Sequence, residues 1–144
     1  MVFDMDMQKI RIAIVIGKFH RQIAEEMLAR VREKAEELDA DIAEVVEVPG
    51  SYEAPVVVKK LLERADVDCV AVSGFIEKGE TLHGEQMGLV VSKALKKLEL
   101  QYSKPVGMGI IGPGATEEQA LKRLDCGAAA VEAAVKMVEI LRKI

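Results

Sequence analysis

The sequence predicts an α/β fold, a three-layer α/β/α sandwich built on a four-stranded parallel sheet. Short apolar runs typical of buried strands alternate with longer segments whose apolar residues recur every three or four positions. Such alternation is the pattern of a parallel sheet with crossover helices. The 144 residues are enough for a single domain with its own core, and no linker, repeat or low-complexity segment divides them.

The first half of the chain contains two strand–helix units. A strand is expected over residues 10–16 and a helix over about 22–38, where the apolar spacing is helical. A second strand over residues 41–48 ends at a proline-glycine turn. The helix from about 52 to 64 holds Pro55 in its first turn, where proline is tolerated. The inward faces of these helices are expected to carry Ile23, Met27, Val31, Leu38, Val57, Leu61 and Leu62.

The second half begins with two further units. Residues 68–76 form an apolar run typical of a strand buried on both faces, and a helix follows Thr81. A strand over residues 105–111 is expected to end where Gly112-Pro113-Gly114 breaks the chain. The helix between these strands is expected to pack through Met87, Val90, Val91, Ala94 and Leu98.

Two signals organise the C-terminal segment. Thr116 and Gln119 have the spacing of a capping box, which fixes the start of a short helix. Residues 125–127 are expected to end that helix. The last helix runs to about Lys143, and its inward face is expected to carry Val131, Ala134, Val135, Val138 and Leu141.

Right-handed crossovers make 2-1-3-4 the natural strand order, a flavodoxin-like arrangement. Ligands of such sheets bind at the carboxyl ends of the strands. The loops over residues 17–21, 49–53, 75–83 and 112–116 are therefore the places where functional residues are expected.

Composition excludes several classes of function. The net charge of −4, with acidic and basic residues mixed along the helices, argues against a nucleic-acid partner. No apolar run approaches a membrane span and no signal peptide is visible, so a cytoplasmic protein is expected. Cys69 and Cys126 fit neither a disulfide framework nor a zinc site, and Cys69 is expected to be a small buried hydrophobic residue. The lack of asparagine hints at a hot-living source.

The turn from Gly79 to His83 is the most informative loop. It lies between a buried strand and the start of a helix, where backbone N–H groups and the helix dipole favour an anion such as phosphate. Thr81 can cap the helix or donate to an oxyanion, and His83 can exchange protons near neutral pH. The turn therefore predicts an acid–base group beside a phosphate site.

The other loops carry weaker signals. Phe19 follows the first strand and is either a core residue or a platform for a flat heterocycle. Residues 51–53, Ser-Tyr-Glu, either cap a helix or bind a polyol. The charged residues Glu77, Lys78 and Glu80 could be solvated loop residues, and His20 is expected to be solvated. Arg123 gains a role only if the fold returns it to the Gly79 turn.

Together these loops resemble the 6,7-dimethyl-8-ribityllumazine synthase family over roughly residues 10 to 142. The matching pieces, in order and with compatible spacing, are Phe19, Val48-Pro49-Gly50-Ser51-Tyr52-Glu53-Ala54-Pro55, Gly79-Glu80-Thr81-Leu82-His83, Thr116-Glu117-Glu118-Gln119-Ala120-Leu121-Lys122-Arg123 and Val131-Glu132-Ala133-Ala134. The short Asp125-Cys126-Gly127 link looks more like the archaeal branch than the bacterial one.

The resemblance implies that 5-amino-6-(D-ribitylamino)uracil condenses with 3,4-dihydroxy-2-butanone 4-phosphate, with loss of phosphate and two waters, in the penultimate step of riboflavin biosynthesis. It implies no metal and no other cofactor. His83 would be the catalytic residue. The pyrimidine and its ribityl chain would be bound by Phe19, Ser51, Tyr52, Glu53, Phe75, Ile76, Lys78 and Met108, and the phosphate by Gly79, Glu80, Thr81 and Arg123.

The family also implies a homopentamer with sites shared between subunits, and in some members a shell of sixty subunits. Val2-Phe3, in a predicted N-terminal arm over residues 1–8, could add a strand to a neighbour's sheet. Three positions depart from the family pattern. His20 stands where Asn often follows the aromatic residue, Met108 replaces an aromatic residue of bacterial members, and Ala128-Ala129 occupies a region where Lys often contributes.

Other functions remain open from sequence alone. An archaeal riboflavin synthase would bind no phosphate, which would leave Thr81, His83 and Arg123 without a purpose. A non-catalytic flavin or lumazine carrier is favoured by Ala128-Ala129 and disfavoured by His83 and Arg123. A shell protein would form a large particle whether or not it is catalytic, and a flavodoxin-like domain with another ligand is the least specific reading.

Overall fold

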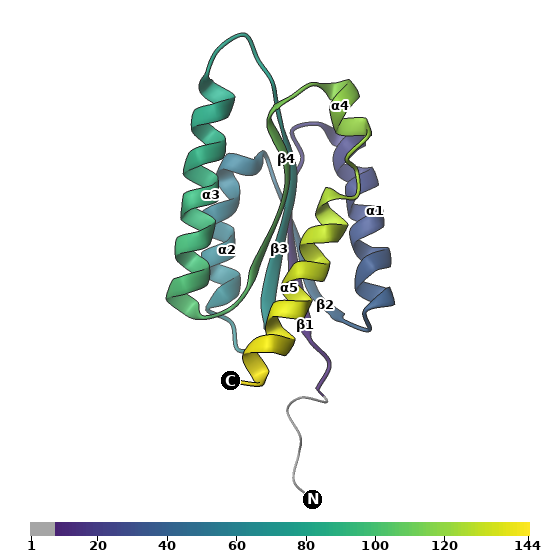
Figure 1. Ribbon diagram of the computed structural model, residues 1–144, viewed down its shortest axis with the longest axis vertical. Helices are drawn as coiled ribbons and strands as arrows, with labels where there is room; N and C mark the ends of the chain where they lie inside the picture. The colour runs from purple at the N-terminus through teal and green to yellow at the C-terminus, as the bar shows by residue number, and fades with distance from the viewer. Residues whose placement is uncertain (1–7) are drawn as a thin grey trace, which may run out of the picture.

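The computed structural model describes residues 8–144 and shows a parallel four-stranded sheet between two layers of helices (Figure 1). The strands are β1 Arg11–Gly17, β2 Asp41–Val48, β3 Cys69–Glu77 and β4 Val106–Ala115. Their order in the sheet is β2-β1-β3-β4, with every neighbouring pair parallel, which confirms the predicted class and topology. Residues 1–7, most of the predicted N-terminal arm, lie outside the described residues.

Helices cover both faces of the sheet. α1 (Arg21–Glu37) and α5 (Cys126–Arg142) pack together on one face, while α2 (Ala54–Leu62) and α3 (His83–Tyr102) cover the other (Figure 1). A 3-10 turn over Ser51–Glu53 precedes α2, and Pro55 lies in the first turn of α2 as predicted. The short helix α4 (Glu117–Leu121) follows β4 and begins with the predicted capping box between Thr116 and Gln119.

The central strands β1 and β3 form the core. Ile12 and Ile14 of β1 pack towards α1 and α5, while Ala13 and Val15 pack towards α2, and all four are fully buried. Cys69 at the start of β3 is also fully buried, and burial raises the pKa of its thiol to about 12. Cys69 is thus a small core residue with an unreactive thiol, as predicted.

β4 is longer than predicted. Gly112-Pro113-Gly114 does not end the strand, which continues to Ala115 and pairs there with Glu77 across an irregularity in the register. β4 is an edge strand, and an edge strand tolerates proline because it has a side without ladder hydrogen bonds. The ring of Pro113 packs instead on Gly88 of α3, where a Cβ would lie 2.6 Å from its Cδ.

The assignment of residues 125–127 as the end of the short helix was wrong. α4 ends at Leu121, and α5 already begins at Cys126. Gly127 is buried, and a Cβ there would collide with the hydroxyl of Ser73 on β3. Glycine at this position therefore lets α5 approach the sheet, and it does not stop a helix.

Two predicted core residues lie outside. Val90 is 51% exposed because α3 packs through Gly88, Val91 and Leu95, a face that leaves Val90 to one side. Leu141, near the end of α5, is 41% exposed. No helix of the described part of the chain is long and apolar enough to cross a membrane.

The ion pair between Arg11 and Asp68 ties the start of β1 to the start of β3. Asp68 accepts hydrogen bonds from the backbone N–H and the guanidinium of Arg11, at 2.8 to 3.1 Å. Partial burial alone would raise the pKa of Asp68, but the hydrogen bonds from Arg11 outweigh it and lower this pKa. The ionised carboxylate therefore stabilises the folded state above the ordinary carboxyl pKa, and this contribution is lost as the pH falls through the lowered one.

We expect Asp68→Asn to lower the free energy of unfolding at pH 7 by about 1–3 kcal/mol, because a half-buried set of donors loses its charged acceptor. The difference from the wild type should shrink below about pH 4. Urea unfolding at several pH values measures it, with Asp39→Asn as the control, since that side chain is 81% exposed. Equal effects of the two substitutions at pH 7 would contradict the assignment.

Candidate active site

A cavity of about 400 Å³ opens at the carboxyl ends of the strands. It lies between the loops that follow β1, β2 and β3 and the first turn of α3. The residues that line it are Phe19, Pro49, Gly50, Ser51, Glu53, Phe75, Ile76, Glu77, Gly79, Thr81, His83, Gly84 and Met87. Three of the four loops predicted to carry function therefore meet at one cavity.

Ser51 is seated against the sheet by two glycines. A Cβ at Gly17 of β1 would lie 3.0 Å from the backbone nitrogen of Ser51, and a Cβ at Gly74 of β3 would collide with its hydroxyl. Ser51 is only 4% exposed, and its Oγ has no hydrogen-bond partner within residues 8–144. A buried hydroxyl without a partner is costly, so this group is suited to bind a polar ligand that enters the cavity.

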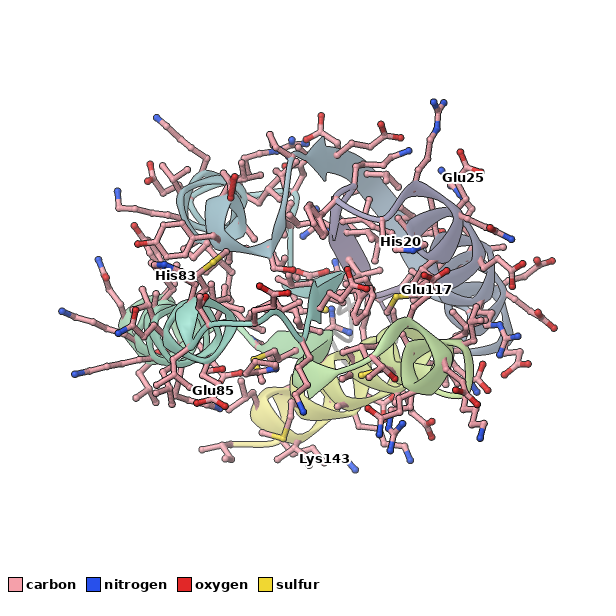
Figure 2. The ribbon with its side chains drawn as sticks, turned by 90° about the horizontal axis from the view of Figure 1, so that it is seen from above. His20, Glu25, His83, Glu85, Glu117 and Lys143 are labelled. Atoms are coloured by element: carbon pink, nitrogen blue, oxygen red, sulfur yellow. The ribbon has the colours of Figure 1, made fainter. Side chains whose placement is uncertain are left out.

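Thr81 and His83 stand together at the start of α3. The backbone N–H of His83 donates to Oγ1 of Thr81 at 3.4 Å. The N-cap of α3 is Leu82, whose side chain makes no capping hydrogen bond, so the predicted capping role of Thr81 is not confirmed. The N–H of Gln86 donates to the carbonyl of Leu82 in the first turn of α3. The N–H groups of the residues before Gln86 have no acceptor of this kind within the helix. His83 is exposed and lies at the α3 end of the cavity (Figure 2).

The charges of the cavity are unbalanced. Its lining contains the carboxylates of Glu53 and Glu77, whereas none of the residues that line it is a lysine or an arginine. An anion at the start of α3 would be held by backbone N–H groups, Thr81 and His83, without a full positive charge. A phosphorylated ligand therefore needs a cation from outside this cavity.

Five predicted site residues do not line the cavity. Lys78 and Glu80 line a neighbouring hollow of about 180 Å³ together with Gly79 and Thr81. Tyr52 is 51% exposed, and Met108 lines a separate groove between α3 and α5. Arg123 follows α4, a helix that lies on the other side of β4 from α3 (Figure 1). Its guanidinium donates to the carbonyl of Gln119. The chain alone does not bring Arg123 to the Gly79 turn.

Sequence analysis did not assign a functional role to several lining residues. Pro49, Gly50, Gly84 and Met87 belong to loops and a helix start that were singled out, but their side chains carry little chemistry. For Glu77 a solvated loop charge was left open, although its place at the end of β3, beside Ile76, could have indicated the cavity. Ala128 and Ala129 line a groove between α1 and α5, away from the cavity.

Within residues 8–144, no three His, Cys, Asp or Glu side chains are grouped so as to hold a metal ion. The cavity offers an aromatic surface, the unpartnered hydroxyl of Ser51, the carboxylates of Glu53 and Glu77, helix N–H donors and one histidine. Such a set suits acid–base catalysis on a bound organic ligand.

A model of the 6,7-dimethyl-8-ribityllumazine synthase family matches residues 9–142. A protein of that name from Metallosphaera sedula is 44% identical over 134 residues, which cover 92% of this chain and 89% of the relative. One from Methanopyrus kandleri is 43% identical over 96% of this chain and 98% of its own length. One from Archaeoglobus fulgidus is 40% identical over 95% of this chain and 96% of its own length. All three similarities include every loop of the cavity.

Proposed function

The chain belongs to the 6,7-dimethyl-8-ribityllumazine synthase family, and on this basis we propose that its strand-end cavity condenses 5-amino-6-(D-ribitylamino)uracil with 3,4-dihydroxy-2-butanone 4-phosphate. The products are 6,7-dimethyl-8-ribityllumazine, phosphate and water. The observation that carries the proposal is the meeting of Phe19, the unpartnered Ser51 hydroxyl, Thr81 and His83 at one cavity.

The loops after β1 and β2 bind the pyrimidine substrate. Phe19 is 69% exposed at the rim of the cavity, so its ring is available to stack on a flat heterocycle. Ser51 and Glu53 bind hydroxyls of the ribityl chain, since both line the cavity and the Ser51 hydroxyl needs a partner. Ile76 packs against the ring.

The start of α3 binds the phosphate group of the second substrate. The backbone of Glu80 and Thr81, with the Thr81 hydroxyl, holds the phosphate where the helix dipole favours an anion. His83 lies beside it and moves protons during imine formation and phosphate elimination. Both substrates are then held in register, which supplies a further part of the rate acceleration.

We also propose that a second copy of the chain completes each site. The cavity has no cation of its own, while Arg123 lies on the far side of the sheet edge, where it can serve a neighbour. Exposed apolar side chains on α2 and α3 suit contact with another copy: Val56 is 68% exposed, Leu89 72% and Val90 51%. A ring of five such contacts, alone or within a sixty-subunit shell, closes without leaving an unused interface.

The test is formation of lumazine, followed by absorbance and fluorescence, after the purified protein is mixed with both substrates. The uncatalysed condensation is the blank, and phosphate release is measured in parallel. Lumazine and phosphate in equal amounts, well above the blank, support the proposal. Tight binding of lumazine or flavin without acceleration would favour a carrier, and conversion of lumazine to riboflavin would favour a riboflavin synthase.

A further inference from the structure

His20 is packed and not solvated, contrary to the expectation for a loop histidine. Its side chain is 23% exposed, and its ring centroid lies 5.8 Å from that of Phe75 at an interplanar angle of 54°. Its Nε2 lies 3.4 Å from Oε1 of Glu117, and Figure 2 shows the two residues side by side. Its Nδ1 is buried without a hydrogen-bond partner in the described part of the chain. The ring thus contacts β3 and α4 from the turn between β1 and α1.

This turn holds Phe19. The side chain of Phe19 is largely in solvent, so its orientation depends on the backbone on either side of it. On one side, the N–H of Lys18 donates to the carbonyl of Val48 at 2.9 Å. On the other side, His20 is the residue that fixes the chain, since its carbonyl accepts from Ala24 and its ring is packed against Phe75.

Phe75 connects the same ring to the cavity. It is 4% exposed, lines the cavity and lies under the side chain of His20. Oε1 of Glu117, in the first turn of α4, lies 3.4 Å from Nε2 of the imidazole, and the capping box at Thr116 holds that turn in place. His20 is therefore placed to orient both Phe19 at the rim of the cavity and Phe75 in its wall.

We propose that His20, held by Glu117, is a positioning residue that orients Phe19 and Phe75 for the pyrimidine ring. The identity of the ligand rests on the proposed function. His20 does not touch the substrate, so its loss should weaken binding of the pyrimidine and leave binding of the phosphorylated substrate unchanged.

The experiment compares His20→Ala, His20→Phe and Glu117→Gln with Glu118→Gln as the matched control. Glu118 occupies the same first turn of α4 and is exposed, so its substitution removes the same helix-dipole interaction without touching His20. Steady-state kinetics give the KM for each substrate. Fluorescence titration with 6,7-dimethyl-8-ribityllumazine gives an affinity that does not depend on turnover.

We expect His20→Ala to raise the KM for the pyrimidine and the Kd for the lumazine about tenfold. Glu117→Gln and His20→Phe should raise both about threefold, and Glu117→Gln should add nothing in the His20→Ala background, because the contact is then already lost. Glu118→Gln should match the wild type, and no variant should change the KM for the butanone phosphate.

Equal behaviour of Glu117→Gln and Glu118→Gln, or a parallel rise in both KM values, would overturn the proposal. If His20→Ala does not fold, His20→Phe and Glu117→Gln still decide it. If the wild type forms no lumazine, the proposed function fails. The lumazine titration alone then tests whether His20 and Glu117 orient Phe19 and Phe75.

Discussion

Replacing His83 by alanine is expected to lower kcat on the order of 100-fold, because the only histidine that lines the cavity is then missing from the proton transfers. The affinity for lumazine should stay within about twofold of the wild type, since the residues proposed to bind it, Phe19 and Ser51, are unchanged. Stopped-flow kinetics and fluorescence titration measure the two quantities.

His83→Gln is the matched variant for this experiment. Glutamine can donate and accept hydrogen bonds but does not titrate near neutral pH, so it should remain as slow as His83→Ala. Light scattering of both variants should give the wild-type mass, because His83 is exposed at the cavity. A wild-type kcat in either variant would remove this histidine from the mechanism.

Replacing Arg123 by alanine is expected to raise the KM for the butanone phosphate by about one to two orders of magnitude. A charge-assisted hydrogen bond is typically worth about 1.5–3 kcal/mol, and no lysine or arginine lines the cavity to substitute for it. The KM for the pyrimidine should change little. Initial rates at varied concentrations of each substrate separate the two effects.

Lys122→Ala is the control for Arg123, because both side chains are exposed at the end of α4. It should leave both KM values near those of the wild type. Arg123→Lys should recover part of the loss, since it keeps the charge and loses the two-pronged geometry. Equal effects of Arg123→Ala on the two substrates would argue against its role as the phosphate clamp.

Much of the fold was predictable from local patterns. The apolar runs of β1 and β3 are buried on both faces, and the capping box at Thr116 gives the start of α4 from two residues. The handedness of crossovers then selects the strand order. Each of these signals lies within a few residues of sequence, which is why it could be interpreted without the structure.

The errors came from features that depend on distant contacts. Pro113 lies within β4 because β4 is an edge strand, and edge status is not visible in a local segment. Gly127 permits a close approach to Ser73, but glycine before an apolar helix also looks like a helix end. The packing of His20 against Phe75 joins residues from two strand ends.

The site was predictable in part for the same reason. The loops after three strands of one sheet carry Phe19, Ser51, Thr81 and His83. A single chain therefore brings these residues to one cavity. Arg123 and Met108 lie at or beyond the edge strand and do not reach that cavity. The proposed contribution of a second copy depends on assembly, which no spacing within one chain encodes.

The central claim, a condensation site completed by a second copy, is tested most directly by mixing two inactive chains. His83→Ala and Arg123→Ala chains with different tags are produced in one cell, mixed assemblies are isolated, and lumazine formation is measured at low butanone phosphate. Roughly a quarter of the sites should then combine an intact His83 with a neighbour's intact Arg123, so activity should rise well above that of either parent. Activity equal to the mean of the two parents would contradict a shared site.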